Sequence, residues 1–330
     1  MSEISLKDHP ELSQYFTGLD TVPSGICSIQ VTPNTAPWII CPRRLFYMGN
    51  KAFTKTLLGT TQKKLLSKCK FSSGKRIGIW SEAKVIYVGD NATEKNAFFD
   101  YTFDYVLCEL GRVPLKSASL LTDIPESELK RKLTSAGHTL ALIDGEVMVE
   151  NFPVGSPYIV EVMTSSTSGG NKKIRSCIPQ AFEDSVLNKR HIAPGINYRQ
   201  VWARMASQMI VKSQAAIAWG GHTIWVLQDL LADYISSSTA LDLKQFISEH
   251  LQEVNILSFS YSQKYVSPTK NETIELTDST LYSGPIRPFN GKTTKVPPSF
   301  QDIVLASVCP PKSVLLAALC KKPITNIIRL

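Results

Sequence analysis

A series of β-rich apolar runs, broken by one long helical stretch, constrains the fold of this chain most strongly. The runs cover residues 77–89, 101–110, 157–164, 223–227 and 254–261. Between them, a helix is expected from Tyr198 to about Ile217, because Asn197 is a good N-cap and Gln200 stands at capping-box distance. Further helices are expected near 127–135, 180–187, 228–236, 240–251 and 313–320. This alternation predicts an α/β fold with a mixed central sheet flanked by helices.

The 330 residues leave room for one large α/β domain with additions. We expect an N-terminal basic segment over 1–75, a core over 76–265 and a C-terminal extension over 266–330. The extension is rich in Pro and Gly, so we expect it to be loop-rich and packed on the core.

Positive charge is concentrated in residues 43–76, which carry ten Lys and Arg and no Asp or Glu. The whole chain has a net charge of only +8, so the remainder is slightly negative. Such a segment favours a polyanionic partner, because each neutralised phosphate releases counterions. The alternative is a solvated helix face within 51–70. The residues of this segment expected to contact the phosphates of that partner are Arg43, Arg44, Lys63 and Lys64.

Two carboxylates stand inside otherwise apolar strands. Asp104 lies in Thr102–Leu107 and Glu161 in Ile159–Met163. A buried carboxylate costs several kcal/mol unless it is paired or bound to metal. Two such acids on adjacent strands can converge on a hard divalent cation, and Mg²⁺ fits that description. Pairing with Arg or capping of a neighbouring backbone is the structural alternative for each acid.

In its motif order the sequence resembles the PD-(D/E)XK nucleases, and specifically the NotI family of type II restriction endonucleases. The resemblance covers about residues 22–235. It is carried by Gly25-Ile26-Cys27, Trp38 to Arg43, the Phe103-Asp104 strand with Leu107 and Glu109, Glu161-Val-Met-Thr164, and the helix Val201 to Lys212.

The resemblance implies a Mg²⁺-dependent enzyme that cuts double-stranded DNA at a palindromic site. It also implies a homodimer and a companion DNA methyltransferase in the same system. Asp104 and Glu161 fall on the family's metal-binding positions, and Glu82 matches a further acidic position. An exposed strand charge is the alternative for Glu82.

One departure from the family concerns the residue two positions after Glu161. The nuclease core has Lys there, or Gln in NotI-like members, whereas this chain has Met163, which cannot orient a water molecule. Gln208 is our candidate for the missing catalytic role, because it shares a polar helical stripe with Arg204 and Lys212. Arg204 and Lys212, with the loop residues Lys172 and Lys173, are expected to contact DNA. The two loop lysines are also alternatives for the missing role.

A second departure concerns cysteine. Only Cys27 and Cys41 match the four N-terminal cysteines that hold a structural metal in NotI-like proteins, so no metal is expected there. The polar N-terminus and the absence of a long apolar stretch suggest a cytoplasmic protein without a membrane span.

The sequence therefore predicts a site-specific DNA endonuclease. Two competitors stay open. Met163 suggests a DNA-binding protein of the same fold that has lost cleavage. The Ser/Gly-rich loop 165–171 suggests an RNA- or nucleotide-directed phosphotransferase.

Overall fold

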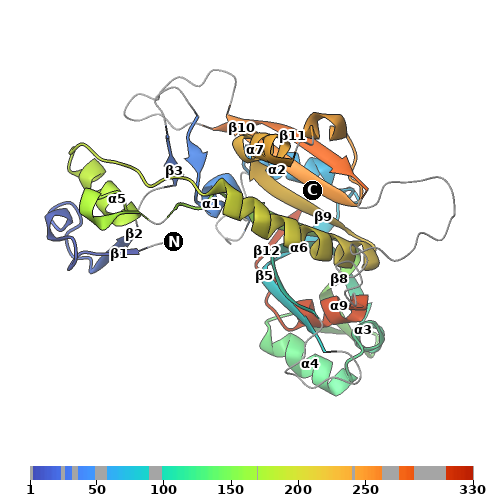
Figure 1. Ribbon diagram of the computed structural model, residues 1–330. Coiled ribbons are helices and arrows are strands. Elements are labelled where there is room, and N and C mark those ends of the chain that lie inside the picture. The colour runs from blue at the N-terminus through green and yellow to red at the C-terminus, as the bar shows by residue number, and fades with distance from the viewer. Residues whose placement is uncertain are drawn as a thin grey trace.

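An eight-stranded mixed sheet forms the centre of the protein in the computed structural model (Figure 1). The structure describes residues 3–23, 27–31, 36–48, 58–88, 99–168, 170–239, 242–261, 275–285 and 310–329. In spatial order the strands are β11 (Leu276–Gly284), β10 (Val254–Tyr261), β9 (His222–Gln228), β8 (Glu146–Met163), β6 (Phe99–Pro114), β5 (Arg76–Tyr87) and β12 (Asn326–Arg329). The short strand β7 (Leu140–Ile143) pairs with β8.

The pairing directions make the sheet mixed. β5, β6 and β8 form an antiparallel meander, whereas β8, β9 and β10 run parallel to one another. The helix α6 (Tyr198–Ala218) makes the crossover from β8 to β9 and lies obliquely across the sheet in Figure 1. The side chain of Asn197 accepts a hydrogen bond from the Gln200 backbone N–H, which confirms the expected cap.

Both faces of the sheet are covered, which explains why its strands are apolar on both sides. α6, α7 (Asp229–Thr239) and α9 (Lys312–Cys320) pack on one face, through Ile159, Trp225 and Leu315 among others. α1 (Pro42–Leu45) and α2 (Thr60–Lys68) pack on the other, against Val160 and Val226. α3 (Leu115–Thr122) and α4 (Glu126–Ser135) join α9 around a third apolar cluster at one end of the sheet.

A small lobe stands beside the sheet (Figure 1). It consists of β1 (Glu3–Ser5), the 3₁₀ turn η1 (Pro10–Leu12), β2 (Thr21–Pro23), η3 (Lys172–Ile174) and α5 (Ile178–Val186). Its own apolar core includes Leu12 and Phe182. A separate hairpin of β3 (Ser28–Ile29) and β4 (Trp38–Ile39) precedes α1.

The expected mixed α/β sheet with flanking helices is confirmed, but the prediction for 240–251 is wrong. In the described part of that range, only a 3₁₀ turn forms, η4 (Leu243–Phe246). Local side-chain bonds replace helical ones there: Asp242 accepts from the Lys244 N–H, and Ser248 accepts from the His250 N–H.

The C-terminal extension differs from the expected loop-rich addition. β11 pairs with β10, and β12 pairs with β5, so residues beyond 266 complete the sheet at both edges. Most of the Pro- and Gly-rich stretch 284–298 lies outside the described residues. Within the described residues, no helix is long and apolar enough to cross a membrane.

Candidate active site

Three carboxylates lie in one row across three neighbouring strands. On β6 and β8 the last registered pair is Tyr105 with Val160, so Asp104 and Glu161 are the next residues opposite each other. On β5 and β6 the pairs on either side, Ser81 with Tyr105 and Ala83 with Phe103, place Glu82 opposite Asp104. The expected adjacency of the Asp104 and Glu161 strands is therefore confirmed.

The strands change conformation at this row. Glu82 has a φ of 51°, in the left-handed region that non-glycine residues rarely adopt. Strand alternation is interrupted there, since Trp80 and Ala83 both face the α6 side of the sheet. The carboxylate of Asp104 accepts a hydrogen bond of 2.8 Å from the backbone N–H of Val162. The Asp104 side chain thus accepts the hydrogen bond that a backbone carbonyl of β6 would accept if the pairing of β6 with β8 continued.

Glu161 is paired with a buried lysine from α6. The ammonium of Lys212 lies 2.7 Å from Oε2 of Glu161 and donates a second bond of 2.8 Å to the carbonyl of Thr102. Both side chains of the ion pair are only 4% exposed. The ammonium also lies 5.3 Å from the ring centroid of Phe103 and 5.9 Å from that of Trp225. Lys212 is thus held by an anion, a carbonyl and two aromatic faces.

Burial perturbs both acids in the same direction. It raises the pKa of Glu161, with Asp104 adding to the rise and Lys212 opposing it. It also raises the pKa of Asp104, while the Val162 N–H and Lys212 oppose the rise and Glu82 adds to it. Both acids therefore favour a cation or a proton more strongly than exposed carboxyl groups do.

The donor set fits a hard divalent cation. Oε1 of Glu161 is buried and has no hydrogen-bond partner among the described residues. Such an orphaned acceptor is costly unless something binds it. In the described part of the chain, no group of three or more His, Cys, Asp or Glu side chains is arranged to hold a metal, so Glu82 does not join Asp104 and Glu161 as the third ligand that the resemblance implied. Mg²⁺ does not need one, since it is commonly held by one or two carboxylates, water and substrate phosphates.

The three residues of the polar stripe on α6 differ in their exposure, and one of them is not where the sequence predicts it. Lys212 is 3% exposed, so its ammonium is enclosed beside Glu161 and does not stand on the surface expected to contact DNA. Gln208 is half-buried one turn earlier, and no hydrogen bond joins it to either acid among the described contacts. Arg204 is exposed, as its expected role requires. Met163 packs on the apolar cluster beneath α6 and α7.

The basic residues of 43–76 divide between two places. Arg43 and Arg44 follow the β4 hairpin, which is joined to the end of β8 because Thr164 donates to the carbonyl of Ile40. Lys63 and Lys64 lie on α2, which covers the sheet face opposite to α6 and Lys212. Lys64 also bonds to the carbonyl of Thr277. Lys51 and Lys55 lie outside the described residues.

Cys27 and Cys41, the two cysteines that match NotI-like positions, lie at the base of the β3–β4 hairpin. The N–H of Cys41 donates to the carbonyl of Cys27 over 3.3 Å. Burial and the neighbouring Cys41 thiol raise the pKa of Cys27. Gly25 and Ile26 of the same motif lie outside the described residues.

The burial of Lys212 beside Glu161 was not predicted from the sequence. The stripe of Arg204, Gln208 and Lys212 was the signal that drew attention to this residue, but it does not show which of the three is buried. No protein-family model and no curated protein matches this chain.

Proposed function

We propose that the protein is a Mg²⁺-dependent endonuclease with a PD-(D/E)XK-type core, acting on double-stranded DNA. One observation carries the proposal: Asp104 and Glu161 face each other on neighbouring strands, and a buried lysine contacts the second acid. The order of elements supports it. A helix (α2), three antiparallel strands (β5, β6, β8), a crossover helix (α6) and a parallel strand (β9) occur in this order along the chain, with the acids on the second and third strands. Further elements are inserted between β6 and β8 and between β8 and α6.

Asp104 and Glu161 would hold the metal ion through Oε1 of Glu161 and the Asp104 carboxylate. When bound, Mg²⁺ lowers the pKa of a coordinated water and stabilises charge on a phosphate. The Lys212 ammonium offsets the charge of Glu161 and holds its Oε2, which leaves Oε1 for the metal ion. Lys212 thus supplies from α6 the cation that Met163 cannot supply from β8.

The remaining family-level properties belong to this proposal. They are cleavage at a specific, palindromic site, action as a homodimer, and a companion methyltransferase that protects the same site. Arg43 and Arg44, which follow the hairpin joined to the end of β8, and the exposed Arg204 on α6 are proposed phosphate contacts. A cleavage-deficient DNA-binding protein is the second candidate, favoured by the apolar packing of Met163.

Cleavage of supercoiled plasmid DNA tests the proposal. We expect Mg²⁺-dependent discrete fragments with the native protein and none with Asp104→Asn. This substitution keeps the shape of the side chain but removes its negative charge. Asp100→Asn is the matched control, because Asp100 is a half-exposed acid on the same strand. Salt-sensitive DNA binding without any scission by the native protein would support the second candidate and refute the enzyme.

A further inference from the structure

The part of the lobe that carries η3 and α5 is inserted between the strand of Glu161 and the helix of Lys212. The chain leaves β8 at Met163, and two antiparallel backbone hydrogen bonds form a stem: Ser168 N–H to Gly195 at 2.8 Å, and Asn197 N–H to Ser166 at 2.7 Å. The returning chain runs directly into α6. Both ends of this inserted segment are therefore fixed to elements that carry the candidate active site.

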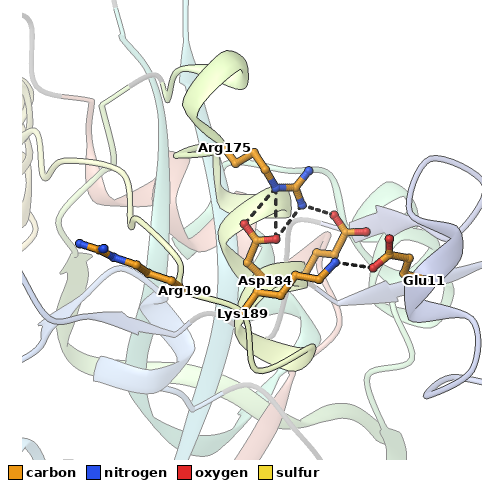
Figure 2. A pocket seen from close by; sticks show the side chains of 6 residues that line it. Glu11, Arg175, Asp184, Lys189 and Arg190 are labelled. Carbon is orange, nitrogen blue, oxygen red and sulfur yellow. Dashed lines mark hydrogen bonds and ion pairs between the residues drawn. The ribbon is translucent and has the colours of Figure 1, made fainter.

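A cluster of ion pairs holds the lobe together (Figure 2). Arg175 bonds to Asp184 at 2.9 Å and to Glu183 at 2.5 Å, and Lys189 lies 2.5 Å from Glu11 of the N-terminal segment. These residues line a hollow of about 400 Å³. Every acid that lines the hollow is thus engaged by a cation of the lobe.

The ion pairs of the lobe do not neutralise all of its positive charge. Residues 170–194 contain five Lys and Arg but only two acids, and both acids bind Arg175. Lys172, Lys173 and Arg190 are exposed, and the described contacts give none of them a carboxylate partner. In Figure 2 the guanidinium of Arg190 points away from the ion pairs.

Two exposed apolar side chains stand near these cations in the sequence. Ile174 is 57% exposed and directly follows the two lysines, and Ile192 is 53% exposed two residues after Arg190. Some proteins that bind the minor groove of DNA combine basic residues with apolar side chains that insert between base steps.

We propose that Lys172, Lys173 and Arg190 form a second DNA contact, which binds phosphates of the duplex flanking the cleavage site. The inference rests on the proposed nuclease function. Five residues of extended chain separate Glu161 from the stem at Ser166, a span of at most about 17 Å. That length corresponds to about five base steps of B-DNA. Lys172 lies six residues beyond Ser166, which adds at most about 20 Å, so the contact is expected within about 11 base steps of the cut.

The salt dependence of DNA binding tests this contact. The probe is a 30-base-pair duplex, and the protein carries Asp104→Asn so that the duplex stays intact. Changing Lys172, Lys173 and Arg190 together to Ala should make the slope of log K against log salt less negative by about 2.7, or about 0.9 for each lost phosphate contact. The matched control removes three exposed cations from α3 and α4, Lys116, Lys130 and Arg131, and should leave the slope unchanged.

Equal slope changes in the two triple variants, or no change in either, would overturn the inference. Plasmid cleavage by protein with native Asp104 separates this failure from that of the proposed function. If the native protein cuts while the slopes refute the contact, only the lobe assignment fails. If it neither cuts nor binds DNA, the proposed function fails as well.

Discussion

The ion pair of Glu161 and Lys212 leads to an unusual prediction for the substitution Glu161→Gln. It should destabilise the protein when Lys212 is present and stabilise it when Lys212 is replaced by Met. With Lys212 present, the substitution leaves a buried ammonium without its anion. Breaking such a pair costs about 3–5 kcal/mol. With Lys212→Met in place, by contrast, Glu161 can stay buried only as the neutral acid, whereas Gln is neutral at every pH.

The size of the second effect follows from the ordinary Glu pKa of 4.5. Protonating the carboxyl at pH 7.5 costs up to 3 × 1.36, or about 4 kcal/mol, but only about 0.7 kcal/mol at pH 5. A folded-state pKa raised by burial lowers stability as pH rises above 4.5, so the gain from Gln must grow with pH. In the Lys212→Met background, Glu161→Gln should therefore stabilise by up to about 4 kcal/mol at pH 7.5.

Urea unfolding followed by tryptophan fluorescence, at pH 5 and pH 7.5, measures all four proteins of this cycle. Phe103→Leu, which removes an aromatic wall but no charge, is a control that should show no such pH dependence. If Glu161→Gln has the same sign in both backgrounds, or if its effect in the Lys212→Met background ignores pH, the buried ion pair is not as the structure describes it.

Three further predictions follow from the same part of the sheet. Glu82→Gly should raise the free energy of unfolding by up to about 1 kcal/mol and Glu82→Val should lower it, because the φ of 51° suits glycine and not a β-branched residue; chemical denaturation compares them. Gly221→Ala should destabilise strongly, since a Cβ there would lie 1.9 Å from the carbonyl oxygen of Pro157; a melting temperature equal to that of the native protein would refute the close approach. Mn²⁺ affinity measured by calorimetry should rise with pH through the neutral range, because the raised pKa values of Asp104 and Glu161 make protons compete with the metal; a flat profile would contradict this.

The sequence predicted the core of the sheet well. The bounds of β10 agree with the predicted strand at both ends, and α6 begins after the expected cap at Asn197. The strands β11 and β12 were not predicted. β12 has only four residues, and its register exists only against the distant strand β5. Short edge strands carry little signal of their own.

The two acids of the site could be predicted from the sequence, but the position of the lysine beside them could not. A carboxylate inside an apolar strand is visible in the sequence, and so Asp104 and Glu161 could be named. The burial of Lys212 depends on how α6 is rotated over the sheet, and a stripe of three polar residues does not fix that rotation. The change of strand conformation at Glu82 likewise has no sequence signature.

The position of a bound metal tests the central claim most directly. Crystals grown with Mn²⁺ allow an anomalous difference map at the manganese absorption edge. We predict a single strong peak within coordination distance of both Asp104 and Glu161, lost in Asp104→Asn. A map with no peak there, or with manganese bound only elsewhere, would contradict the assignment of these acids to one cation.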